Sequence, residues 1–345
     1  MRTHQLLKQM IVSGGITPKR IVNLIRNYSG FVVKNLHVSG FPSLVMIEPT
    51  NLCNLHCPLC PTGNRTLRAP RGYMKFEDYK RIVDEIGDYV LMLTLYNYGE
   101  PFLNKNIFEM IEYAKKKRIF IRTSTNGHLI GDKERISRLV KSGLDHMIVS
   151  LDGATQETFQ KYRVGGNFNK VIENIRMIVE EKKLQHSSTP YIELQFIVMR
   201  HNEHEIPIIK KVAEEIGVDR LKLKTTNLSN YPEEDIEKMK EYLPENSSLR
   251  RYKLENGKVV RTAKIKNKCI WLWFGTVVNW DGSVVPCCYD PHRSIEVGNA
   301  FKENSLKKIW FSERYANLRK VVLNNKRSIK ICEKCPGTFT GPDAE

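Results

Sequence analysis

Three cysteines stand close together in the first quarter of the 345-residue chain, at Cys53, Cys57 and Cys60. Two prolines within and just after this triplet argue against a helix and favour a loop that curls around a metal centre. A cubane iron–sulfur cluster takes one ligand per iron, so three thiolates leave one of its four irons open. An open position suits a catalytic site, because a substrate can bind the metal there. The alternative is a zinc site that borrows a fourth ligand such as His56.

In its surroundings, Glu48 to Pro61, this triplet resembles the signature of the radical S-adenosylmethionine (SAM) superfamily. The resemblance extends over residues 44–335 and implies a SAM-binding [4Fe-4S] cluster on the three cysteines, with SAM on the open iron. It also implies that an electron passed through the cluster cleaves SAM to a 5′-deoxyadenosyl radical, which abstracts hydrogen from a substrate. Such an enzyme needs an electron donor, for example flavodoxin or ferredoxin.

The segment Tyr98-Gly99-Glu100-Pro101 follows the second expected strand. Gly99 permits a close approach of the backbone, and the Glu100 carboxylate can accept a hydrogen bond from an ammonium group. Family members carry a Gly-Gly-Glu-like element here that meets the SAM amino group, which implies this role for Gly99 and Glu100. Tyr98 departs from the pattern, because it stands where the first glycine is expected.

Polar residues also follow the third and fourth expected strands. By the same resemblance Asn126, Ser150 and Asp152 contact SAM, with Asp152 or Ser150 near the ribose. Arg163 resembles the arginine that pairs with the SAM carboxylate, a group that a guanidinium fork suits well. The alternative for these residues is that they cap helices or form turns.

Five further cysteines lie in the last quarter of the chain: Cys269, Cys287, Cys288, Cys332 and Cys335. Four thiolates can ligate every iron of a cubane, which suits electron transfer or a structural role better than substrate ligation. The pattern is similar to the C-terminal domain of the SPASM and twitch subgroups of radical SAM enzymes, in a one-cluster form. This implies an auxiliary [4Fe-4S] cluster on Cys269, Cys287, Cys332 and Cys335, with Cys288 as a spare or alternate ligand. A four-thiolate zinc ribbon is the alternative.

The elements that must position these residues alternate between strand-length apolar runs and helical patterns. The predicted strands are Leu44–Ile47, Val90–Leu95, Ile119–Thr123, His146–Ser150, Tyr191–Val198 and Leu221–Lys224. The predicted helices are Phe76–Ile86, Ile107–Lys117, Asp132–Ser142, Thr155–Arg163, Val171–Leu184 and Ile206–Gly217. Such alternation predicts a parallel sheet with right-handed crossovers, in which the active site lies at the carboxyl ends of the strands.

We expect an α/β fold: a partial (βα)6 TIM-like barrel, an N-terminal helical extension and a small C-terminal α+β SPASM/twitch-like domain. The predicted domains are a basic helical extension at 1–43, a radical SAM core at 44–226, a connection at 227–268 and the auxiliary cluster domain at 269–345. In the last domain we predict a hairpin of residues 276–278 and 283–285, followed by one helix over about residues 305–323.

The formal net charge is +17, and the first acidic residue is Glu48. Residues 1–43 are therefore basic, and they could lie on anionic lipid, hold an acidic substrate or touch nucleic acid. The alternative is a solvated helix pair packed on the main domain. No run is apolar and long enough for a transmembrane segment, and the start lacks the pattern of a signal peptide. We expect a cytoplasmic location, where cysteines stay reduced, with peripheral membrane contact as one option.

The favoured hypothesis is oxidation of the substrate by dehydrogenation, with the auxiliary cluster as electron acceptor. The alternatives are a peptide-modifying maturase, an enzyme acting on an anionic lipid, glycan or RNA, and a non-catalytic metal-binding module. The catalytic acid or base is not assigned from the sequence. The pocket candidates, none of them selected, are Tyr96, His201, His204, Asp290 and His292.

Overall fold

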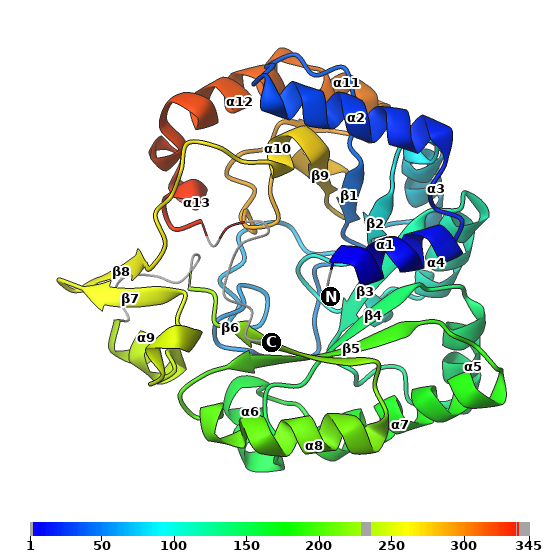
Figure 1. Ribbon diagram of the computed structural model, residues 1–345, viewed down its shortest axis with the longest axis vertical. Helices are drawn as coiled ribbons and strands as arrows, with labels where there is room; N and C mark the ends of the chain where they lie inside the picture. The colour runs from blue at the N-terminus through cyan, green and yellow to red at the C-terminus, as the bar shows by residue number, and fades with distance from the viewer. Residues whose placement is uncertain (1–2, 229–235, 336, 338–345) are drawn as a thin grey trace.

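The computed structural model describes residues 3–228, 236–335 and 337. Its centre is a nine-stranded sheet with the strand order β11-β10-β9-β1-β2-β3-β4-β5-β6 (Figure 1). Strands β9 and β1 to β6 are parallel to one another, whereas β10 and β11 are antiparallel to their neighbours. The strands are β1 Leu44–Ile47, β2 Met92–Thr94, β3 Phe120–Thr125, β4 His146–Ser150, β5 Tyr191–Val198, β6 Arg220–Thr225, β9 Gly275–Val278, β10 Ser283–Val285 and β11 Gly298–Asn299.

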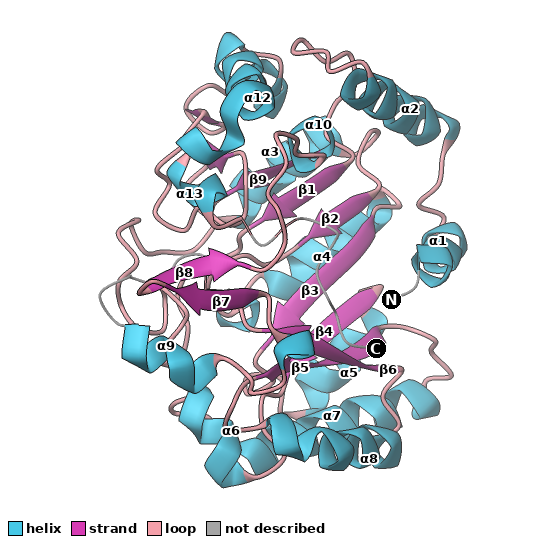
Figure 2. Ribbon diagram, turned by 60° about the vertical axis from the view of Figure 1, so that its left-hand side comes forward, coloured by secondary structure: helices cyan, strands magenta, loops and turns pink. Residues whose placement is uncertain are grey.

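Helices connect the parallel strands and cover the outer face of the sheet (Figures 1 and 2). They are α3 Phe76–Ile86, α4 Ile107–Lys116, α5 Lys133–Lys141, α6 Gln156–Tyr162, α7 Phe168–Leu184 and α8 Ile206–Ile216. Local sequence signals explain where two of these helices begin or end. Thr155 and Thr158 form a capping box at the start of α6, and Gly217 ends α8 in the left-handed conformation at φ 78°.

Side chains of each strand alternate between the two faces of this sheet, as β4 illustrates. Met147 and Val149 belong to the main hydrophobic core under the helices. Ser150 lines a cavity on the other, concave face. The structure is thus a partial barrel, and the predicted fold class is confirmed. Strands β1, β4 and β5 have their predicted bounds, and the other three predicted strands differ from the structure by one or two residues at each end.

The predicted C-terminal hairpin is present as β9 and β10, but it belongs to the main sheet. Strand β9 pairs in parallel with β1, with Leu44 opposite Gly275. The rest of the described chain after β6 includes a separate hairpin and short helices: β7 Tyr252–Glu255, β8 Lys258–Arg261, α9 Ile236–Tyr242, α10 Trp271–Phe274 and α13 Lys330–Glu333. The proposed domain boundaries are not tested by this topology and stay predictions; residues 229–235, 336 and 338–345 lie outside the described part.

The single helix predicted over about residues 305–323 is wrong, because two helices occupy this region. They are α11 Leu306–Trp310 and α12 Glu313–Asn325. The break lies at Phe311 and Ser312. The Ser312 hydroxyl donates to the Ile309 carbonyl at 2.7 Å. This side chain therefore competes with the backbone N–H groups that a continuous helix would direct at that carbonyl. The Phe311 ring stacks on Phe41, with 6.2 Å between the ring centroids.

Two helices precede the sheet and form the predicted N-terminal extension: α1 Thr3–Val12 and α2 Pro18–Val32. Thr17 caps α2 by accepting from the Arg20 N–H, and Pro18 occupies the first turn, where it needs no hydrogen-bond donor. Within the described ranges no helix is both long enough and apolar enough to cross a membrane.

Candidate active site

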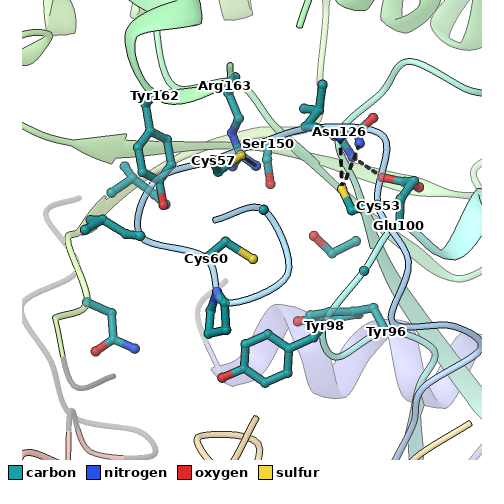
Figure 3. A pocket seen from close by; sticks show the side chains of 18 of the residues that line it. Cys53, Cys57, Cys60, Tyr96, Tyr98, Glu100, Asn126, Ser150, Tyr162 and Arg163 are labelled. Atoms are coloured by element: carbon teal, nitrogen blue, oxygen red, sulfur yellow. Dashed lines mark hydrogen bonds between the residues drawn. The ribbon is translucent and has the colours of Figure 1, made fainter. Parts of the chain in front are cut away.

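The first three cysteines lie on the loop that follows β1, and all three line one cavity of about 350 Å³. Figure 3 shows Cys53 beside Asn126 and Cys57 beside Arg163, with Cys60 facing the same hollow. The opposite wall comes from segments that follow β2, β3, β4 and β6. The cavity is therefore at the carboxyl ends of the strands, where a parallel sheet places its active site.

Two glycines allow this loop to fold so tightly. A Cβ on Gly63 would lie 2.5 Å from the Cys57 nitrogen. A Cβ on Gly99 would lie 2.5 Å from the Thr50 carbonyl oxygen, and Gly99 also has a φ of +97°. The close backbone approach predicted for Gly99 is thus an approach to the cysteine loop itself. The Glu100 N–H donates to the Leu52 carbonyl at 2.7 Å and ties the two segments together.

The donor set suits an iron–sulfur cluster that has one open iron. Three thiols surround one cavity, and soft thiolate ligands favour such clusters. Burial raises the pKa of Cys57 to about 12, although Arg163 opposes this, so metal binding has to displace its proton. In the described part of the chain, no three His, Cys, Asp or Glu side chains converge tightly enough to hold a single metal ion.

Arg163 is fixed beside the cysteines by a buried carboxylate. Its Nε donates to Asp152 Oδ2 at 2.6 Å, and its Nη1 lies 3.7 Å from Cys57 Sγ. Burial by itself would lower the pKa of Arg163, but Asp152 and Cys57 raise it above its ordinary value. Asp152 is fully buried and also accepts from the Ile197 N–H at 2.7 Å. Asp152 is not among the described residues that line the cavity, whereas Arg163 and Ser150 are.

Glu100 organises the segment that follows β3. Its carboxylate accepts from the Asn126 N–H at 2.7 Å and from the Thr125 hydroxyl at 2.8 Å. The Asn126 side chain donates to Asn54 at 2.8 Å and lies 3.8 Å from Cys53 Sγ. Burial raises the pKa of Glu100 to about 7, against these hydrogen bonds. Both Glu100 and Asn126 line the cavity, so one corner of it joins a carboxylate, an amide and a thiol.

Several cavity residues were not nominated from the sequence. Tyrosines and two cations complete the wall: Tyr98, Tyr162, Tyr289, Lys224 and Arg251. Tyr98 replaces the expected glycine of the family pattern, and that departure was the only sequence signal for it. The others come from non-local segments and carry no motif.

Among the five acid–base candidates, Tyr96 is the one that lines the cavity within the described residues. Asp290 is buried and accepts from the Ser294 and Ile295 N–H groups, both at 2.8 Å, so it holds a turn. His292 Nδ1 accepts from the Arg68 N–H at 3.4 Å, away from the cysteines. His201 and His204 are likewise not among the described lining residues.

The second cysteine set surrounds another, small cavity. Cys269, Cys287, Cys332 and Cys335 all line it, and its other walls are mostly apolar, with Leu272, Leu318 and Val322 among them. Lys326 is buried here, and its Nζ lies 3.4 Å from Cys335 Sγ. Its charge would offset part of the negative charge of four thiolates. Four thiols around one small cavity fit a cluster with no open iron.

Cys288 faces away from this second cavity. It packs with Met46, Val277 and Val285, whereas its neighbour Cys287 lines the cavity. One further residue, Tyr289, lines both the first and the second cavity. The two cysteine sites are therefore neighbours that share a wall, although their cysteines are more than 200 residues apart in sequence.

Comparison with known proteins places each cysteine set within the residues matched by a different family model. Residues 47–192 match the model of the radical SAM superfamily, and residues 269–336 match that of an iron–sulfur cluster-binding domain, SPASM. The AdoMet-dependent heme synthase of Methanosarcina barkeri is 28% identical over 52% of this chain and 49% of its own. The chain thus spans about half the length of that relative.

Two other similarities extend further along the chain. The tungsten-containing aldehyde ferredoxin oxidoreductase cofactor-modifying protein of Pyrococcus furiosus is 25% identical, over 81% of this chain and 83% of its own. The structure of Streptococcus suis SuiB bound to precursor peptide SuiA superposes with a TM-score of 0.62 at 17% identity, over 92% of this chain and 76% of that one. At this identity the SuiB structure supports the fold alone.

The two matched models account for both cysteine sets. A SAM-binding [4Fe-4S] cluster and an auxiliary iron–sulfur cluster are the cofactors that these domains carry, and the two thiol-lined cavities fit them. Neither cysteine set therefore needs the zinc alternative. The chain therefore combines a radical SAM domain with a C-terminal SPASM-type iron–sulfur cluster-binding domain.

Proposed function

We propose that this enzyme dehydrogenates its substrate. The observation that carries the proposal is the shared wall between a three-thiol cavity and a four-thiol cavity. SAM on a cluster at Cys53, Cys57 and Cys60 supplies the power to abstract a hydrogen atom, and an auxiliary [4Fe-4S] cluster on the second cysteine set supplies an electron acceptor. Two electrons and two hydrogens then leave the substrate: a hydrogen atom into 5′-deoxyadenosine, a proton to a base and an electron to the acceptor.

The chain's own residues bind and orient in this proposal. Arg163 holds the SAM carboxylate through its guanidinium fork. Asp152, which the sequence suggested as a ribose ligand, instead positions Arg163, because both of its oxygens are engaged in the buried interior. Gly99 and Glu100 keep the cysteine loop and the segment after β3 in place, and Asn126 and Ser150 face SAM.

The far wall of the cavity suggests the substrate class. Lys224 and Arg251 line it, opposite the cysteine loop, and Glu100 is the acidic residue among the described lining residues. A small substrate with a carboxylate or phosphate group would find a cationic partner there. We further propose a cytoplasmic location and an acidic donor such as flavodoxin or ferredoxin, which the net charge of +17 would attract.

The test is the redox behaviour of the second cluster by itself. Cys57→Ala should remove the SAM-binding cluster, so electron paramagnetic resonance of the reconstituted variant reports the auxiliary cluster alone. We expect dithionite to reduce it to a paramagnetic form. A second cluster that no reductant of this strength can reduce would rule out the role of electron acceptor and leave the superfamily assignment intact.

Peptide modification is the second candidate, favoured by the extensive superposition on SuiB with its precursor peptide. In this chain the segment before the barrel is two helices rather than a peptide-binding strand motif. A short peptide encoded beside this gene, when incubated with the reconstituted enzyme and SAM, would acquire a mass change under this candidate. An unchanged peptide, together with oxidation of a small acidic substrate, would favour dehydrogenation.

A further inference from the structure

Helix α2 turns its apolar side to solvent. Ile21, Val22, Ile25, Tyr28 and Val32 are between 44% and 61% exposed. Their spacing places them on one side of the helix, and we call these five residues the apolar stripe. A helix on the surface of a globular protein normally buries such a face. The exposed arrangement therefore indicates that something else covers the stripe.

The inward side of α2 packs Leu24 and Phe31 on the core, and its buried polar side chains fix the orientation of the helix. The Asn23 amide donates to the Phe41 carbonyl at 2.8 Å and accepts from the Phe41 N–H at 2.7 Å. The Asn27 amide donates to the same carbonyl at 2.8 Å and to the Ser43 hydroxyl at 2.9 Å. Turning the stripe inward would leave these buried groups without partners and would therefore destabilise the fold.

Arg20 adds a second anchor on the same side. Its guanidinium is buried and donates to four backbone carbonyls, at 2.6–2.8 Å, from Gly15, Gly87, Lys117 and Arg118. The last three precede β2 and β3, so α2 is tied to the edge at which the parallel strands begin. The active-site cavity lies at the opposite edge, where the strands end.

Basic residues accompany the stripe without any acidic ones. Residues 1–47 contain no Asp or Glu. Lys19 is paired with Asp88 at 2.6 Å, but no ion pair involves the exposed Arg26 or Lys34 among the described residues. Helix α1 adds exposed apolar residues of its own, with Ile11 and Val12 the most exposed. The surface is thus apolar and cationic at once.

We propose that the apolar stripe, with Arg26 and Lys34, docks on the surface of an anionic phospholipid bilayer. Apolar residues beside cations are what an in-plane interfacial helix needs, since the former enter the acyl boundary and the latter meet lipid phosphates. A second copy of the chain would bring the same unpaired cations together in a two-fold contact. Nucleic acid would leave the apolar residues without a partner.

The position of α2 sets the orientation of the docked enzyme. Figure 2 shows α1 and α2 on the side where the strands begin, with the arrowheads pointing away from them. The contact with the bilayer therefore lies away from the cavity, which is at the ends of the strands, and leaves it uncovered. This contact holds the enzyme at the membrane and admits substrate from the aqueous side, so it does not deliver a lipid headgroup of the same bilayer to the cysteines.

The test is flotation of the full-length, reconstituted protein with vesicles. Binding is expected to vesicles of phosphatidylcholine mixed with phosphatidylglycerol, and to weaken as salt is raised. Ile25→Ser, Tyr28→Ser and Val32→Ser together should weaken binding at least about tenfold. Arg26→Gln with Lys34→Gln should weaken binding to the anionic vesicles about thirtyfold, at about 1 kcal/mol for each charge. Pure phosphatidylcholine vesicles should not distinguish this charge variant from the wild type.

The matched control is Leu184→Ser with Ile208→Ser, which removes exposed apolar residues from α7 and α8 and should leave vesicle binding unchanged. All variants should form 5′-deoxyadenosine at the wild-type rate, so failure of the docking proposal is separate from failure of the proposed reaction. Absence of vesicle binding would overturn the proposal, as would equal binding by the stripe variant. A concentration-dependent dimer that the stripe variant abolishes would assign the surface to a second copy instead.

Discussion

The two cysteine sites differ in the number of thiols, in size and in polarity. The first has three thiols on a cavity of about 350 Å³, with Arg163 and several tyrosines in its wall. The second has four thiols around a small, mostly apolar cavity. A larger, partly polar cavity with one ligand missing is suited to binding small molecules, and a small apolar one with a full ligand set is suited to passing electrons. This difference supports the proposal that the first site carries the chemistry and that the second accepts an electron.

The largest expected effect is at the first site. Cys57→Ala should reduce 5′-deoxyadenosine formation to the background of protein without iron, because the cluster loses one of only three protein ligands. The measurement is product formation by chromatography after dithionite reduction. The visible spectrum of the second cluster should remain, which serves as the internal control. Substantial cleavage of SAM by this variant would contradict the assignment of the first site.

At the second site a cysteine substitution should act on iron content rather than on SAM cleavage. Cys332→Ala should lower bound iron from about eight to about four atoms per chain and leave substrate-free SAM cleavage largely intact. Cys288→Ala is the matched control and should keep the full iron content, because Cys288 packs away from the cavity. If Cys288→Ala loses iron and Cys287→Ala does not, the proposed ligand set is incorrect.

A smaller effect, on the KM for SAM, is expected from substitutions of Arg163, which lines the first cavity. Arg163→Lys keeps the charge but loses the guanidinium fork, so the KM for SAM should rise about tenfold, as expected for a hydrogen bond to a charged group. Asp152→Asn should raise it less, because Asp152 acts through Arg163. Steady-state cleavage kinetics measure both values. Arg200→Lys, at an exposed arginine, is the control, and an unchanged KM in Arg163→Lys would remove the proposed carboxylate contact.

The smallest expected effect concerns Glu48. This buried carboxylate lies between Tyr98, which lines the first cavity, and Arg293, which follows Cys288 in the chain. The Glu48 carboxylate accepts from the Tyr98 N–H at 3.2 Å and lies 3.9 Å from Arg293. Burial raises the pKa of Glu48 to about 7 in the folded state, although Arg293 opposes the shift. The folded protein then binds more protons than the unfolded chain between about pH 4.5 and pH 7, so stability from this group is lost as pH rises through that window.

In the Glu48→Gln variant, stability should therefore decrease less than in the wild type as the pH rises from about 4.5 to about 7. Thermal unfolding midpoints of the variant and the wild type, compared at several pH values, measure the difference. The exposed Glu77→Gln is the control and should follow the wild type. Identical slopes for wild type and Glu48→Gln would show that Glu48 is not protonated in the folded protein.

The sequence predicted those features that depend on local signals. The spacing of Cys53, Cys57 and Cys60 is contained in one loop, and the apolar runs of β1, β4 and β5 are strand-length segments with clear ends. Non-local pairing was not predictable in this way. Strand β9 joins β1 across more than 200 residues, and nothing in either short apolar run specifies the other as its partner.

The surroundings of individual side chains were predicted less well than the helices and strands, because they too depend on contacts between segments that are distant in sequence. The sequence places Asp152 just after β4, but its hydrogen bond with Arg163 depends on how α6 ends beside it and carries no sequence signal. The helical pattern of α2 indicates an apolar face without saying which way that face points. Arg20, Asn23 and Asn27 decide this, through backbone groups of distant loops.

The most direct test of the central claim is anaerobic reconstitution with iron and sulfide, followed by dithionite reduction and addition of SAM. The account predicts 5′-deoxyadenosine, with about eight irons bound per chain as two four-iron clusters require. A protein that retains zinc at its cysteines and forms no 5′-deoxyadenosine would contradict it.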